Sequence, residues 1–227
     1  QSIVAIVCEN KIFRLCDVRS GAVVQTLAGH SEAIRCVEWS PRDSYHLATG
    51  SVDGTVRIRD VRRSGRSACL HSLDQRGLHP STNSSSPSPE KRRKIMADHV
   101  GSPHSTLAST KTKAHDGMVN ALCYASSGSY LITAGKKNKS SRRYDDSVGT
   151  GDEDPIHLWD LLGNAAHKCK EFKNVSNRCR NDNIRMEVVR AGINPLDDIL
   201  FFPCSTRCDI IGFPLHSPRG EAIIALT

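Results

Sequence analysis

Residues 29–62 read GHSEAIRCVEWSPRDSYHLATGSVDGTVRIRDVR, and this stretch decides the fold class of the chain. Apolar and polar residues alternate along three short runs, which is the pattern of β-strands with one buried face. An Asp53-Gly54 pair separates the last two runs and favours a tight hairpin, because glycine accepts a positive φ without strain. The stretch therefore predicts an antiparallel sheet with strands at 34–39, 47–49 and 56–60.

The ending of this unit occurs twice. Cys16-Asp17-Val18-Arg19 precedes Arg59-Asp60-Val61-Arg62 by 43 residues, and a period of about 40 to 45 residues with four strands is typical of β-propeller blades. The sequence thus predicts an all-β propeller. The expected units are a partial blade at 1–28, a best-formed blade at 29–73, a blade at 114–162 and a degenerate blade at 180–227.

The length of the chain bounds this propeller. A closed ring of seven blades needs about 300 residues, whereas the chain has 227. We therefore expect an incomplete arc of about three to four blades, belonging to a fragment or a truncated form of a longer protein.

Two long polar insertions are predicted to interrupt the repeat. Residues 74–113 include a Ser- and Pro-rich segment with too little apolar surface to offset the entropy of ordering, so we expect a disordered loop. Within this loop, Lys91, Arg92, Arg93 and Lys94 form a basic run that predicts a nuclear import signal and a nuclear location. The alternative for this run is a solvated basic segment. The second insertion, 136–154, is either a long hairpin loop or an altered coding sequence.

Composition limits the classes of partner. The net charge is +7, with a pI of about 9.0, but residues 74–113 hold seven Lys and Arg against three Asp and Glu. Because about half of the excess lies in the predicted loop, direct binding of nucleic acid is not expected. No run approaches about 18 consecutive apolar residues, so no membrane span is expected.

Cysteine usage and motif content argue against catalysis. The nine cysteines show no disulfide framework, and Cys36, Cys69 and Cys123 fall within apolar strand patterns, where a thiol packs as a small hydrophobe. A reducing cytosolic or nuclear compartment fits this usage. We expect no metal, no cofactor and no enzymatic activity. The nearest approaches to half of a zinc site are Cys204 with Cys208 and His167 with Cys169.

Several motifs resemble those of one known family. They are Leu15–Gly21, Leu27–His30, Trp39–Arg42, Leu47–Thr49, Asp60–Arg63 and Ala114–Gly117. These stretches are similar to the Cockayne syndrome A family of WD-repeat proteins. The resemblance implies a seven-bladed substrate receptor of a cullin-4 RING ubiquitin ligase, acting in transcription-coupled nucleotide-excision repair. The implied partners are the ligase adaptor, which is the large damaged-DNA-binding subunit, and repair and transcription factors as substrates.

The same resemblance implies a buried hydrogen-bonded chain in each blade. In the second unit His30, Asp53 and either Thr49 or Ser51 would supply its members, and Arg59 stands where the family has Trp. In the third unit the corresponding residues are His115, Trp159 and Asp160. These residues are expected to stabilise the fold, since an unpaired buried polar group costs about 1 to 3 kcal/mol.

The family also implies how the adaptor is bound. Its signature is Trp-Asp-x-Arg, whose Arg projects from the propeller rim. Arg62 and Arg19 match the Arg position, with Asp60 and Asp17 two residues before them. Both lack the Trp, and Arg62 is the best candidate for the contact. The alternative is that Arg62 is a solvated charge at a strand end.

Two other readings of the chain stay open. One is a generic WD-repeat scaffold of another nuclear complex. The other is a truncated product without a function of its own, since an open arc leaves unpaired strand edges that favour aggregation.

Overall fold

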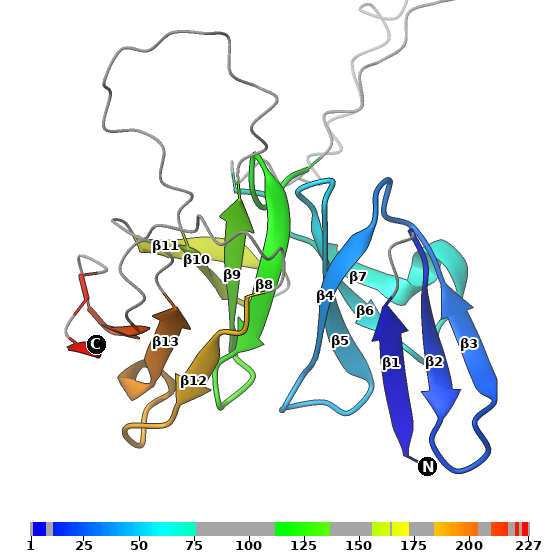
Figure 1. The fold of residues 1–227 in the computed structure, drawn as a ribbon, viewed down its shortest axis with the longest axis horizontal. Helices are drawn as coiled ribbons and strands as arrows, with labels where there is room; N and C mark the ends of the chain where they lie inside the picture. Colours follow the sequence, from blue (N-terminus) through cyan, green and yellow to red (C-terminus); the bar gives the residue numbers. More distant parts are fainter. Residues whose placement is uncertain are drawn as a thin grey trace, which may run out of the picture.

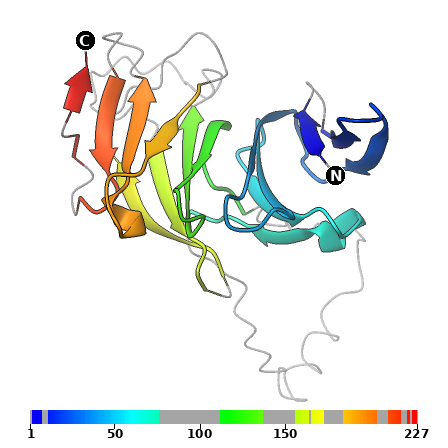
Figure 2. The same ribbon diagram turned by 90° about the horizontal axis from the view of Figure 1, so that it is seen from below.

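The protein folds into β-sheets, as seen in a computed structural model. The structure describes residues 2–7, 11–75, 112–136, 156–163, 165–172, 184–203, 210–217, 221–222 and 224–226. Four antiparallel sheets, which we call blades one to four, follow one another in chain order from blue to red (Figures 1 and 2). The predicted all-β propeller-type fold is confirmed. Most of the two predicted insertions, including the basic run Lys91–Lys94, lies outside the described residues.

Blade one is a three-stranded meander. It contains β1 (Ile3–Val7), β2 (Phe13–Asp17) and β3 (Val23–Leu27) in the order β1-β2-β3. Along β1 every second side chain is half-buried and the others, Val4 and Ile6, are exposed. This alternation follows from the pleat of a strand that packs on one face.

Blade two contains the three strands that the opening stretch predicts, followed by a fourth. Its strands are β4 (Ile34–Trp39), β5 (His46–Ser51), β6 (Val56–Asp60) and β7 (Cys69–Ser72), and the 3-10 turn η1 (Gly65–Ala68) precedes β7. The order β4-β5-β6-β7 places each strand beside its neighbour in the chain, as short hairpins require.

Blade three is longer than the sequence predicts. Its strands are β8 (Met118–Tyr124), β9 (Tyr130–Lys136), β10 (Ile156–Asp160) and β11 (His167–Phe172). The predicted blade ends at residue 162, whereas β11 lies beyond that bound. Since β11 is the outermost strand and pairs only with β10, most of its side chains meet solvent and only Phe172 is fully buried. The blade therefore extends past residue 162.

Blade four completes the described part of the arc. Its strands are β12 (Glu187–Val189), β13 (Ile199–Pro203), β14 (Ile210–Pro214) and β15 (Ile224–Leu226), with the 3-10 turn η3 (Pro195–Asp197) between the first two. The sequence did not indicate β12, because three residues are too few to display an alternating pattern.

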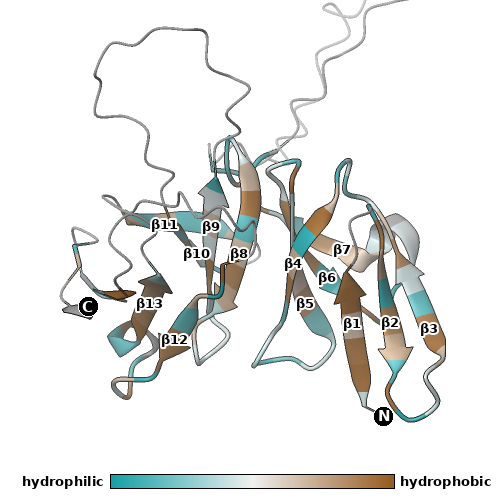
Figure 3. Ribbon diagram, in the orientation of Figure 1, coloured by the Kyte–Doolittle hydropathy of each residue, from teal (hydrophilic) through white to brown (hydrophobic). Residues whose placement is uncertain are grey.

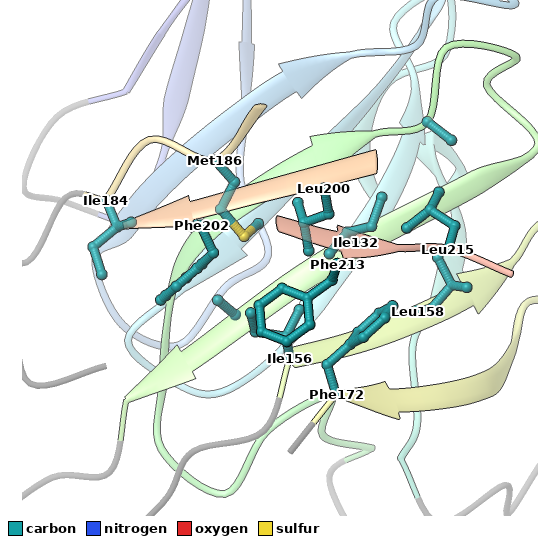
Figure 4. Close-up of a cluster of buried hydrophobic side chains, with 13 residues drawn as sticks. Ile132, Ile156, Leu158, Phe172, Ile184, Met186, Leu200, Phe202, Phe213 and Leu215 are labelled. Carbon is teal, nitrogen blue, oxygen red and sulfur yellow. The ribbon is translucent and has the colours of Figure 1, made fainter. Parts of the chain in front are cut away.

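Apolar clusters fill the spaces between neighbouring blades. Two of the strands that line them, β1 and β13, are largely apolar, as their brown colour in Figure 3 shows. Phe13, Leu27, Ile34 and Leu47 join blades one and two, and Val56, Leu73, Leu131 and Trp159 join blades two and three. Ile132, Phe172, Phe202 and Phe213 join blades three and four (Figure 4). Each blade is thus held by its neighbours, as expected for repeat units that cannot bury their faces alone.

Gly54 and Gly21 give a matched test of how the second and third blades meet. Both have a positive φ, +79° and +67°, so alanine at either position costs about 1 to 2 kcal/mol of backbone strain. A Cβ on Gly54 would also lie 2.5 Å from the backbone oxygen of His115, whereas a Cβ on Gly21 meets nothing within 4 Å. We expect Gly54→Ala to lower the melting temperature in circular dichroism more than Gly21→Ala. Equal losses would contradict the close packing of this turn on blade three.

Candidate functional site

The same turn follows one strand in each of three blades: β2 in blade one, β6 in blade two and β10 in blade three. We name these the rim turns: Asp17–Arg19, Asp60–Arg62 and Asp160–Leu162. Each Asp stands opposite the first residue of the neighbouring strand, Ile3, His46 or Tyr130. The turns therefore occupy equivalent places in the repeat, at the end toward which β2 points in Figure 1.

An aspartate closes each rim turn in the same way. The backbone N–H of Arg19 donates to Oδ1 of Asp17 over 3.0 Å, that of Arg62 to Asp60 over 2.9 Å, and that of Leu162 to Asp160 over 2.8 Å. This bond from a residue two positions further on is the reason that aspartate favours such turns. The Asp of each motif is thus a structural residue.

Asp60 differs from the other two because a pair of guanidinium groups neutralises it. Its side chain is only 3% exposed, and Arg62 donates Nε to Oδ1 and Nη2 to Oδ2, each over 2.9 Å. Nε of Arg63 lies 3.4 Å from Oδ2. The hydrogen bonds from Arg62 lower the pKa of the Asp60 carboxyl to about 2, so this carboxylate stays charged at neutral pH.

The Arg62 side chain packs against the ring of Tyr45. Its guanidinium carbon is 4.5 Å from the centre of the Tyr45 ring, and its side chain is 55% exposed. The resemblance implies an Arg that projects from the rim, whereas the structure holds this one between Asp60 and Tyr45. Among the described residues, its Nη1 has no hydrogen-bond partner. Arg19 is the freer of the two: within the described ranges no partner is recorded for its guanidinium.

The predicted hydrogen-bonded chain of blade two lies at the opposite end of the sheets. Nε2 of His30 is 2.8 Å from Oγ1 of Thr49, and its Nδ1 is 2.9 Å from Oγ1 of Thr55 and 3.5 Å from the Asp53 carboxylate. Thr49 is therefore the strand hydroxyl of the chain. Ser51, the alternative, instead donates to the backbone oxygen of Glu32.

Asp53 anchors the loop that carries His30. Its carboxylate accepts bonds from the backbone and hydroxyl of Thr55 and from the backbone and hydroxyl of Ser31. Burial alone would raise the pKa of this carboxyl, but the hydrogen bonds from His30, Thr55 and Ser31 hold it below its usual value. Neither Thr55 nor Ser31 was predicted. The bond from the Thr55 backbone is a local turn, in which an Asp accepts from the residue two positions on, whereas Ser31 is brought to Asp53 by the fold.

Blade three contains a related chain with different members. Oγ1 of Thr133 lies 2.7 Å from Nε2 of His115 and accepts the indole N–H of Trp159 over 2.9 Å. His115 stacks on a second buried imidazole, His157, with ring centres 4.3 Å apart. Asp160 stays outside this chain because it closes the rim turn.

Arg59 occupies in blade two the place that Trp159 holds in blade three. Its side chain is almost fully buried and its guanidinium carbon lies 5.6 Å from the centre of the Phe13 ring. Among the described residues, its Nε and Nη2 have no hydrogen-bond partner. Burial lowers the pKa of this guanidinium. Because blade two has Arg where blade three has Trp, a cation lies in the seam, that is, the packed interface, between blades one and two.

The described cysteines are unpaired thiols. They are Cys16, Cys36, Cys69, Cys123 and Cys169. Burial raises the pKa of the Cys36 thiol to about 12 and that of Cys123 to about 11. Both side chains pack against apolar clusters and stay protonated at neutral pH.

Two kinds of site are absent from the described ranges. No group of three or more His, Cys, Asp or Glu side chains is placed there to hold a metal ion. Within those ranges no helix is long and apolar enough to span a membrane.

Comparison with known proteins places these features in a family. The model of the WD domain, G-beta repeat, matches residues 21–60 and 105–144. The chain is 30% identical over 187 residues to WD repeat-containing protein ATCSA-1 of Arabidopsis thaliana, which is 70% of this chain and 40% of that relative. It is also 43% identical over 44 residues to an Arabidopsis thaliana WD repeat-containing protein 26 homolog, covering 19% of this chain and 8% of the relative.

A solved structure gives the same fold. A chain in the crystal structure of the mitotic checkpoint complex superposes with a TM-score of 0.59 at 16% identity, over 99% of this chain and 47% of that chain. The chain belongs to the WD-repeat proteins. It spans at most 40% of the length of the two curated relatives named above.

Replacing Arg59 by Trp tests the cost of the buried cation. Arg59→Trp would remove two unpartnered donors and bring an indole N–H toward Thr49, as Trp159 does toward Thr133. We expect the free energy of unfolding in urea to rise by about 1 to 3 kcal/mol. A loss of stability would mean that an acceptor satisfies Arg59 in solution.

Acid is expected to destabilise blade three. Burial lowers the pKa of His157 to about 4 and that of His115 well below 6.5, whereas unfolded histidines titrate near 6.5. Between pH 6.5 and 4 the unfolded chain therefore binds protons that the folded chain does not. The free energy of unfolding thus decreases as the pH is lowered through this range. For His157 alone the loss is about 2 kcal/mol at pH 5.

Urea titrations at pH 7.5 and pH 5 measure this loss. His157→Gln should reduce the difference between the two pH values, whereas the same change at His167, which is exposed on β11, should leave it as in the wild type. A difference unaffected by His157→Gln would contradict the assignment.

Proposed function

We propose that this WD-repeat protein is a substrate receptor of a cullin-4 RING ubiquitin ligase, of the Cockayne syndrome A type. In this role it acts in the nucleus in transcription-coupled nucleotide-excision repair. The propeller binds the ligase adaptor, the large damaged-DNA-binding subunit, and presents repair and transcription factors for modification. It transfers no ubiquitin itself.

One observation carries the proposal: the rim turn of blade two fixes an Arg two residues after a buried Asp. Arg62 is oriented by Asp60 and Tyr45, and within the described part of the chain its Nη1 makes no hydrogen bond. A planar guanidinium held in this way makes directed hydrogen bonds to a carboxylate or a carbonyl at little further entropic cost. The similarity to WD repeat-containing protein ATCSA-1 supports a WD-repeat interaction role.

The rim turns of the other blades differ in ways that rank the contacts. Arg19 repeats the arrangement in blade one without a side-chain bond to Asp17, so it can follow a partner but is less well positioned. Leu162 stands at the same place in blade three and offers no donor. We therefore place the main polar contact at Arg62, with Arg19 as a secondary one.

Removing the Arg62 guanidinium in the full-length protein should weaken adaptor binding. Loss of a charge-assisted hydrogen bond reduces affinity by about tenfold or more, so Arg62→Ala should recover much less adaptor in a pull-down at fixed concentration. Arg62→Lys keeps the charge without the planar fork and should fall between the two. Arg190→Ala removes an exposed arginine of blade four and should bind like the wild type.

A melting curve must accompany this experiment, because Arg62 also bonds the buried Asp60. Variants are compared only at temperatures where each is folded. Recovery of adaptor by folded Arg62→Ala at the wild-type level would contradict the role of Arg62. Failure of the wild-type full-length protein to bind the adaptor would contradict the proposed function and leave the general scaffold role.

A further inference from the structure

Two arginines of β6, Arg57 and Arg59, face the seam between blades one and two. They are two positions apart on one strand, so their side chains leave the same face of the sheet. Val56 and Ile58, which alternate with them, belong to the apolar cluster between blades two and three. Arg59 is 1% exposed, and Arg57 is partly buried. The seam therefore holds two guanidinium groups.

The two guanidinium groups come together beside Gly29. A Cβ placed on Gly29 would lie 2.8 Å from Nη1 of Arg57 and 3.2 Å from Nη2 of Arg59. The arginines thus occupy the side of the backbone where any other residue would carry its side chain. Gly29 itself is exposed, so the two cations lie directly beneath a surface loop, at the end of the sheets opposite the rim turns.

The buried donors of this pair have no acceptor among the described residues. These donors are Nε of Arg57 and both Nε and Nη2 of Arg59. The carboxylate of Asp53 is close by in the His30 chain, but it accepts four hydrogen bonds there. Within the described ranges no ion pair joins it to either arginine. Burial and the charge of Arg57 both lower the pKa of the Arg59 guanidinium. An unpaired buried cation is costly, so this pair calls for an anion.

We infer that the seam between blades one and two binds a phosphoryl oxyanion, held by the guanidinium groups of Arg57 and Arg59. A tetrahedral oxyanion presents acceptors in several directions and carries enough charge to neutralise two guanidinium groups, whereas the two oxygens of a carboxylate match a single guanidinium fork. Arg57 is the partly exposed member of the pair, so its side chain turns outward to admit the ion, and Arg59 forms the inner wall. The site is separate from the rim turns and independent of the proposed function.

Calorimetric titration of the full-length protein with inorganic phosphate tests the site. Sodium chloride keeps the ionic strength constant. Arg57→Gln and Arg59→Trp each remove one of the two guanidinium groups. We expect either change to raise the dissociation constant for phosphate about tenfold or more, because charge-assisted hydrogen bonds are lost. Arg14→Gln removes an exposed arginine of β2 and should leave the dissociation constant at the wild-type value.

O-phosphoserine, titrated in the same way, identifies the source of the phosphoryl group. Tighter binding of inorganic phosphate supports a free ion, and tighter binding of O-phosphoserine supports a group carried on an ester. Melting curves verify that every variant is folded.

The melting temperature gives a second readout. A ligand that binds only the folded state stabilises it, so phosphate should raise the melting temperature of the wild type at constant ionic strength. Arg59→Trp should show little of this rise, and its advantage in stability over the wild type should therefore narrow as phosphate is added.

Three results would overturn the site. One is a wild-type protein that shows neither heat of binding nor a higher melting temperature with phosphate. Another is an equal rise in melting temperature for the wild type and Arg59→Trp, which would show a general effect of the salt. The third is a loss of phosphate binding with Arg14→Gln as large as that with Arg57→Gln.

Discussion

The carboxylate of Asp60 is the constraint on which the candidate site depends. It is buried at the end of β6, closes the rim turn through the backbone of Arg62, and binds the guanidinium of the same residue. A buried charge must be paired, because its removal from water is costly. The pairing fixes Arg62 against Tyr45, and this in turn sets one wall of a groove between blades one and two.

The two ends of the sheets carry different kinds of polar side chain. At the end opposite the rim turns, hydroxyl and imidazole groups tie the loops to the strands, through Thr49 in blade two and Thr133 in blade three. These groups are buried and satisfied, which suits a structural role. At the rim, by contrast, Arg19 and Arg62 keep donors exposed to solvent, which suits recognition.

Substitution at one position changes the seam between blades. Trp159 fills the seam between blades two and three and bonds Thr133. Arg59 stands at the equivalent place, beside Phe13, without an acceptor in the described part of the chain. Blade two, whose rim turn has the paired Asp60–Arg62 bonds, therefore has the less satisfied interface with its neighbour.

The sequence was sufficient for the parts that depend on local pattern. Alternating residues and the Asp53-Gly54 pair predicted β4 to β6, and the repeated Asp-x-Arg ending marked equivalent places in blades one and two. It did not predict β11, because an outer strand needs few apolar residues. Thr55, Thr133 and His157 were missed because their roles depend on which hydroxyl or ring faces His30 or His115. The fixed position of Arg62 depends on Tyr45, which approaches it from a separate loop.

Hydrogen exchange of the full-length protein, with and without the purified adaptor, tests the central claim most directly. The account predicts that the adaptor protects backbone amides of the rim, in the turns after Asp17 and Asp60 and in the β4–β5 connection. Amides at the opposite end, around His30 and Asp53, should exchange at unchanged rates. Protection confined to the loops around His30 and Asp53 would contradict the assignment of the rim as the adaptor-binding surface.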